Sequence, residues 1–167
     1  MVTIGIDPGI ATTGYGIVRE EQDGRLTCLA FGVIQTKRNL SQSQRLLQLY
    51  KNILELINLH QPDLGAVEKL FFEHNVKTAL SVGEARGIAL LALAEHNIKI
   101  SEYTPLEVKQ AVAGYGAADK SQVQQMVRMI LELEAIPHPD DAADALAVAI
   151  CAIHSHKLKF ISTGDAT

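Results

Sequence analysis

The chain has 167 residues, of which 47% are hydrophobic and 20% are charged, and its formal net charge is −4. This length and composition favour one folded domain with a full core and exclude a globally disordered chain. The acidic balance argues mildly against nucleic acid as a partner, although two bound divalent cations would cancel it. The first residues show neither the basic region nor the cleavage pattern of a signal peptide, and no apolar run could span a bilayer, so we expect a cytoplasmic protein.

Apolar periodicity and turn residues predict strands in the first part of the chain and helices in the last. The Asp23-Gly24 pair is typical of a hairpin, so the strands on either side of it should be antiparallel. The pattern Asp119 with Gln122 three residues later is typical of a capped helix start. The predicted strands are 2–7, 14–20, 26–35, 64–68 and 98–103, and the predicted helices are 43–60, 76–96, 105–112, one that begins after Asp119, and 140–156.

This order predicts an α/β fold with a five-stranded mixed sheet, in which three antiparallel strands precede the parallel strands and helices cover both faces. We expect a single domain over residues 1–156 and a disordered tail over 157–167. Within the helix at 76–96, Ala79, Gly83 and Gly87 recur one turn apart. Such a stripe costs helix stability and favours close approach to another element, either the sheet or a second copy of the chain.

Two carboxylates end predicted strands. Strand alternation places Asp7 on the face opposite to Ile4 and Ile6. Glu68 ends a parallel strand, and such strands deliver their last side chains to the edge where open α/β sheets place their sites. Taken singly, Asp7 could instead cap a turn and Glu68 could be a surface acid paired with a lysine.

A pair of carboxylates opens the last helix. Asp141 and Asp144 share one helix face at i and i+3 and could form half of a metal site. Favourable interaction with the helix dipole would explain Asp140 and Asp141, but Asp144 lies in an alanine-rich segment, where a buried carboxylate needs a partner. Asp140 and Asp144 also share a face, so spacing leaves open whether Asp140 joins the site. Acids gathered from three segments favour a divalent metal with oxygen ligands and metal-dependent phosphoryl transfer.

Motifs along nearly the whole chain resemble the RuvC family of bacterial Holliday junction resolvases, which have the ribonuclease H-like fold. No single motif is decisive, but their order is specific. The motifs are Ile-Gly-Ile-Asp-Pro-Gly at 4–9, Thr-Gly-Tyr-Gly at 13–16, Val-Glu at 67–68 with Phe71, Val-Lys-Gln at 108–110, Lys-Ser-Gln-Val-Gln at 120–124 and Asp-Ala-Ala-Asp-Ala-Leu-Ala at 141–147.

The resemblance implies a homodimeric nuclease domain that binds four-way DNA junctions and nicks two strands of like polarity. It implies two Mg²⁺ ions per subunit, which Mn²⁺ could replace, and a branch-migration complex of RuvA and RuvB as partner. It places the family's catalytic and DNA-contacting roles on particular residues: the metal-binding acids on Asp7, Glu68, Asp141 and Asp144, the basic active-site residues on Lys109 and Lys120, and the aromatic residue that meets a base near the crossover on Phe71.

Other functions fit parts of the pattern. Gly9, Gly14 and Gly16 loosely fit the phosphate-binding hairpin of an actin-like ATPase or sugar kinase, but the chain is too short for two nucleotide-enclosing domains. A DNA-binding module without catalysis, or a nuclease of the same fold acting on another branched or RNA substrate, would share most motifs. Without the resemblance, Lys109 and Lys120 would be ordinary surface lysines.

Overall fold

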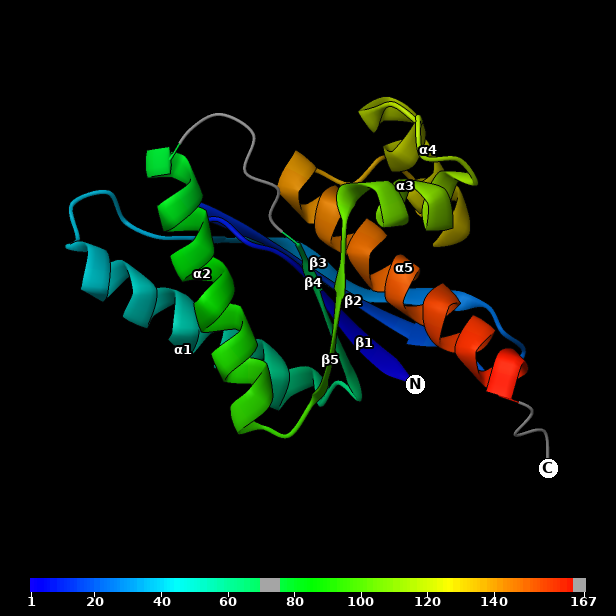
Figure 1. The fold of residues 1–167 in the computed structure, drawn as a ribbon, viewed down its shortest axis with the longest axis horizontal. Coiled ribbons are helices and arrows are strands. Elements are labelled where there is room, and N and C mark those ends of the chain that lie inside the picture. The colour runs from blue at the N-terminus through cyan, green and yellow to red at the C-terminus, as the bar shows by residue number, and fades with distance from the viewer. Residues whose placement is uncertain (70–75, 164–167) are drawn as a thin grey trace.

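The protein forms a five-stranded sheet that is covered by helices on both faces (Figure 1). The computed structural model describes residues 1–69 and 76–163, with side chains described for 1–69 and 79–157. The strands are β1 (Val2–Asp7), β2 (Thr12–Glu20), β3 (Leu26–Gln35), β4 (Leu64–Glu68) and β5 (Lys99–Tyr103), and the helices are α1 (Gln42–His60), α2 (Val76–Glu95), α3 (Pro105–Ala113), α4 (Lys120–Ile130) and α5 (Asp140–Thr163).

The sheet is mixed, as the sequence predicts. Its strand order is β3-β2-β1-β4-β5, with antiparallel pairing among the first three strands of the chain and parallel pairing of β1 with β4 and of β4 with β5. Ile6 lies opposite Val67 in the parallel pair, so the next residues along, Asp7 and Glu68, end neighbouring strands at the same edge. Parallel pairing therefore brings together two acids that lie far apart in the sequence.

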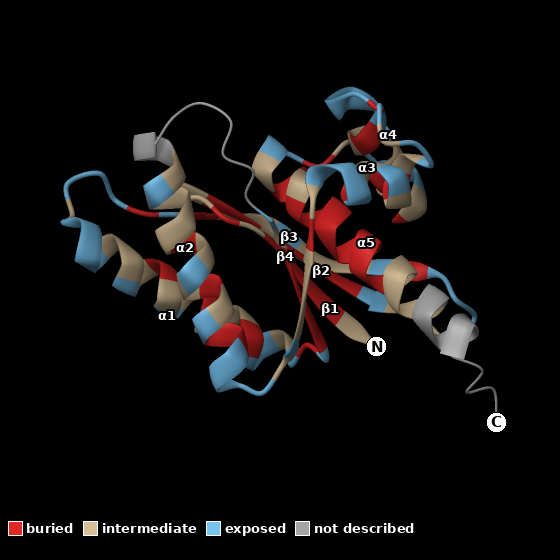
Figure 2. Cartoon of the chain, viewed as in Figure 1, coloured by how far each residue is buried: buried red, intermediate tan, exposed pale blue. Residues whose placement is uncertain are grey.

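The two faces of the sheet carry separate hydrophobic cores. Ile4, Ile6 and Ile17 pack with buried residues of α1 and α2 on one face. The other face is covered by α5, with α3 and α4 outside it, and the central part of α5 is almost entirely buried (Figure 2). Each fully buried isoleucine or leucine contributes roughly 1.5–3 kcal/mol, so this burial fixes where the first turn of α5 lies.

Glycines on β1 and β2 allow α5 to lie directly against the strands. A Cβ atom at Gly14 would collide with the main-chain carbonyl of Asp141, and one at Gly16 would lie 2.9 Å from the Cα atom of Leu146. Gly14 is also the residue that pairs with Asp7 in the antiparallel ladder. The absence of a side chain at Gly14 therefore sets the start of α5 beside the end of β1.

Three sequence expectations need correction. Strand β2 begins at Thr12, two residues before the predicted start. The last helix continues past 156 to Thr163, so most of the predicted disordered tail is helical. Nothing in residues 157–163 breaks a helix, and Lys157 is held by an ion pair with Glu20, with 2.9 Å between Nζ and Oε1.

The small-residue stripe of α2 does not pack on the sheet as a whole. Gly87 is exposed, and a side chain there would meet nothing within 4 Å. The residues of α2 that are buried against the sheet include Ala85, Ala89 and Leu93. Across the described part of the chain, no helix is both long and apolar enough to cross a membrane.

Candidate active site

Asp7 and Glu68 form a buried carboxyl pair at the end of the parallel strands. Burial, followed by the negative charges of Glu68 and Asp144, raises the pKa of Asp7 to about 8. Burial also raises the pKa of Glu68, although the hydrogen bond with Asp7 opposes the rise. Asp7 therefore keeps a proton at neutral pH in the metal-free protein and donates it to the Glu68 carboxylate.

Asp144 faces the same site from the first turns of α5. Burial raises the pKa of Asp144, and a bond from Lys120 to its carboxylate, 2.9 Å between Nζ and Oδ2, opposes the rise. Desolvation lowers the pKa of Lys120, but its bonds with Asp144 and Asp140 outweigh that effect, and the net shift is upward. Lys120 is held in place by the start of α4, where Asp119 and Gln122 form the predicted capping box. The ammonium group thus supplies the positive charge that the buried carboxylate needs.

The two adjacent acids at the start of α5 have different surroundings. The Asp140 side chain is 56% exposed and is directed to α4, where it lies 3.3 Å from Lys120 Nζ and accepts a hydrogen bond of 3.0 Å from Gln124. Asp141 is half-buried, and its charge contributes to the raised pKa of Asp7. The geometry therefore favours Asp141 over Asp140 as the companion of Asp7 and Asp144.

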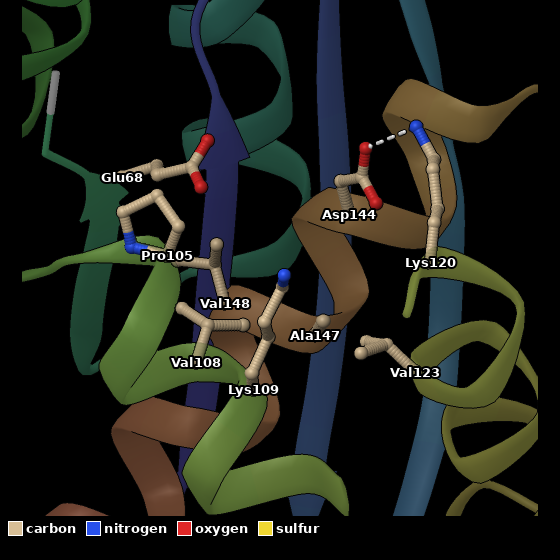
Figure 3. Close-up of a pocket in the computed structure, with 9 residues that line it drawn as sticks. All are labelled: Glu68, Pro105, Val108, Lys109, Lys120, Val123, Asp144, Ala147 and Val148. Carbon is tan, nitrogen blue, oxygen red and sulfur yellow. Dashed lines mark hydrogen bonds and ion pairs between the residues drawn. The ribbon is translucent and has the colours of Figure 1, made fainter. Parts of the chain in front are cut away.

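A hollow of about 270 Å³ adjoins the acids (Figure 3). Glu68, Asp144, Lys109 and Lys120 supply its polar side. Figure 3 shows the Lys109 ammonium group pointing from α3 toward the level of the two carboxylates. Helix α3 is anchored by a capping box at Thr104 and by proline in its first turn, as predicted. The remaining wall is apolar and is formed by Pro105, Val108, Val123, Ala147 and Val148.

The acids do not form a closed metal cage in this arrangement. Within residues 1–69 and 79–157, no three His, Cys, Asp or Glu side chains converge as a ready-made metal site. The shared proton of Asp7 and Glu68 and the ammonium group of Lys120 satisfy the carboxylates instead. The donor set nevertheless suits a hard divalent cation, because every donor is a carboxylate oxygen and the acids repel one another without a positive partner.

Comparison with known proteins agrees with this geometry. Residues 3–152 match the family model described as crossover junction endodeoxyribonuclease RuvC. The chain belongs to the RuvC family. The RuvC protein of Ruminiclostridium cellulolyticum is 54% identical over 99% of both chains, and that of a Roseiflexus species is 58% identical over 89% of this chain and 88% of its own.

Solved RuvC structures share the fold closely. The structure of Thermus thermophilus RuvC matches with a TM-score of 0.89 and 37% identity, covering 95% of this chain and 97% of that one. The same protein in complex with a Holliday junction substrate matches with a TM-score of 0.85 and 35% identity, covering 94% and 96% of the two chains. The predicted ribonuclease H-like fold is therefore confirmed, and the actin-like alternative is wrong.

The structure brings together most of the residues that the RuvC resemblance singles out. Asp7, Glu68, Asp144 and Lys120 interact directly or through their charges. Phe71, the predicted base-contacting residue, lies outside the described residues, as does its neighbour Phe72.

Sequence reasoning missed the apolar wall of the hollow. Val123 had been assigned only to the apolar face of its helix, and Val148 had not been singled out. Both line the hollow, although Val123 is also buried in the core. Their spacing is that of ordinary core residues, so no sequence signal distinguishes the residues at the mouth of a site from those within the core.

Proposed function

We propose that this chain is a metal-dependent endonuclease that resolves four-way DNA junctions by hydrolysing phosphodiester bonds. The observation that carries the proposal is the convergence of Asp7, Glu68 and Asp144 at one sheet edge, with raised pKa values, beside Lys109 and Lys120. Membership of the RuvC family and the junction-bound relative support the choice of substrate.

The acids fit a pair of Mg²⁺ ions, with Mn²⁺ as a possible substitute. Bound metal would activate the attacking water and stabilise the leaving oxygen. Asp7, Glu68, Asp141 and Asp144 are the proposed ligands. Four carboxylates suffice for two such ions, because Mg²⁺ keeps several of its waters and takes few protein ligands. Before metal binds, Asp7 holds a proton and Asp144 holds the Lys120 ammonium, so neither carboxylate is left unpaired.

The two lysines act on the phosphate in this proposal. Lys109 extends from α3 into the hollow beside Glu68 and Asp144. Lys120 lies on the opposite side, and once metal takes over the neutralisation of Asp144 its ammonium group is free to approach a phosphate oxygen. Phe71 remains the proposed contact to an unpaired base, because base stacking on an aromatic ring is worth about 1–3 kcal/mol.

Symmetric cutting of two strands needs two active sites, so we propose a homodimer. Leu80, Gly87 and Leu91 recur along one exposed face of α2, and the two leucines are 67% and 57% exposed. An apolar stripe with a central glycine is suited to close packing against the same helix of a second copy. Docking with RuvA and RuvB and a cytoplasmic location stay predictions from the family resemblance.

A cleavage assay on a synthetic four-way junction tests the proposal. The parent chain should make paired nicks in Mg²⁺ and none in EDTA. Asp7→Asn should bind the junction without cutting it, whereas the matched change Asp140→Asn should leave cutting close to the parent rate, because Asp140 faces α4 and not the buried pair. Cutting by Asp7→Asn at the parent rate would refute the metal-site assignment.

A further inference from the structure

The charges of this acidic chain are unevenly distributed. Residues 24–54 contain five basic residues and no acidic one, and four of the five lie within 36–51. Because the whole chain carries −4 and the segment 36–51 carries +4, the remainder carries −8. The four clustered cations are Lys37, Arg38, Arg45 and Lys51, which we call the α1 basic surface.

These cations are available to a partner. Lys37, Arg38 and Lys51 are exposed. In the part of the chain that the structure describes, none of the four belongs to an ion pair. Other exposed cations differ in this respect: Arg25 pairs with an acid two residues away. A run of unpaired cations on an acidic protein is not needed for solubility, and it marks a surface that favours a polyanion.

The α1 basic surface is also hollowed and rich in hydrogen-bond donors. Lys37 and Lys51 line a shallow hollow of about 400 Å³ together with Gln44, Gln48 and Asn52. Amide side chains and ammonium groups are the donors that most often contact phosphate oxygens without reading the base. The first turn of α1 contains no acidic residue, so its positive end is not neutralised locally.

The position of the surface relative to the acids is fixed by backbone contacts. Gln35 ends β3 opposite Thr12, at the same end of the sheet at which Asp7 ends β1. Thr36 and Arg45 both donate hydrogen bonds to the carbonyl oxygen of Ile10, in the loop that follows Asp7. Figure 1 shows the connection from β3 to α1, in cyan, extending beyond this end of the sheet.

The separation suits a DNA duplex. Strand β3 is two places from β1 in the sheet, which corresponds to about 10 Å across the strands. The major groove alone of B-form DNA is about 12 Å wide. A duplex arm whose phosphate lies at the acids is therefore broad enough to present a second stretch of backbone to α1.

We propose that the α1 basic surface binds the sugar-phosphate backbone of a junction arm, outside the catalytic site. The inference rests on the proposed function, because it takes the substrate to be DNA. Lys37, Arg38 and Lys51 make the phosphate contacts, while Arg45 holds the surface against the loop after Asp7. The contacts strengthen binding and orient the arm, and they leave the chemical step unchanged.

Salt dependence of junction binding tests the proposal. Binding is measured in EDTA, which prevents cutting, between about 50 and 200 mM salt, where phosphate contacts have a large effect. The double variant Lys37→Ala with Lys51→Ala should bind more weakly at low salt, and the slope of log K against log[salt] should become shallower by about 2, close to one unit for each lost contact. The matched control, Arg19→Ala with Lys99→Ala, removes two exposed charges at the opposite end of the sheet and should keep the parent slope.

Two further measurements separate this role from alternatives. At saturating protein in Mg²⁺ the double variant should cut at the parent rate, and Lys37→Arg with Lys51→Arg should restore the parent slope. A double variant with the affinity and slope of a junction-binding parent would overturn the inference and leave the proposed function intact. An equal loss in the control pair would also overturn it. A parent that neither binds nor cuts junctions would overturn the proposed function, and this inference with it.

Discussion

Replacing Asp7 by asparagine should stabilise the metal-free protein while it abolishes cutting. Asp7 has an ordinary pKa of 3.8 and a pKa of about 8 in the folded chain. The folded state therefore binds this proton more tightly than the unfolded state does. The resulting stabilisation is complete below the ordinary pKa and is lost as the pH rises through the folded pKa.

The size of the effect follows from the two pKa values. Each pH unit between them removes about 1.4 kcal/mol from the free energy of unfolding, so at pH 7 the loss is at most about 4 kcal/mol. Asparagine does not ionise, and its amide can still donate to the Glu68 carboxylate as the protonated acid does. Asp7→Asn should therefore remove most of this loss.

Denaturant unfolding in EDTA across pH 4 to 9 measures the difference. The advantage of Asp7→Asn over the parent should grow from pH 4 to pH 8 and level off above that. Adding Mg²⁺ should reverse the order, because metal binds the folded parent and stabilises it by mass action. Asp140→Asn is the matched control: bonds with Gln124 and Lys120 lower the pKa of Asp140, so this change should bring no gain. A variant no more stable than the parent at pH 8, with an unchanged pH slope, would refute the reasoning.

Three further predictions concern helix docking, proton release and assembly. Gly14→Ala should reduce cutting more than 100-fold, because a Cβ atom there displaces the start of α5, whereas Gly87→Ala should not affect cutting; equal rates in a junction assay would contradict this. Mg²⁺ binding at pH 7 should release about one proton, because Asp7 must ionise, and its affinity should rise with pH up to about 8; calorimetry in buffers of different ionisation enthalpy would show it, and binding without proton release would argue against a protonated Asp7. Leu91→Glu should lower the mass in solution from dimer to monomer, as measured by light scattering, whereas Leu59→Glu, on an exposed part of α1, should not; an intact Leu91→Glu dimer would exclude the α2 interface.

Much of the fold could be predicted from local patterns in the sequence. The alternation in the first strand assigns Ile4 and Ile6 to one core and Asp7 to the other face, and the structure confirms both assignments. Capping at Thr104 and Asp119 follows from hydrogen bonds between residues three apart, which need no tertiary context. The end of the last helix was predicted too early because its last turns depend on Lys157 contacting a distant strand.

The sequence by itself determined which acids are available, in what order, and at the ends of which elements. Only the tertiary structure decided how they meet. Gly14 allows α5 to lie against the strands, and this contact selects Asp141, not Asp140, as the neighbour of Asp7. The raised pKa of Asp7 likewise depends on burial and on charges from other elements. Spacing along a chain fixes local geometry, but the burial and electrostatic field at a carboxylate depend on segments that only packing brings together.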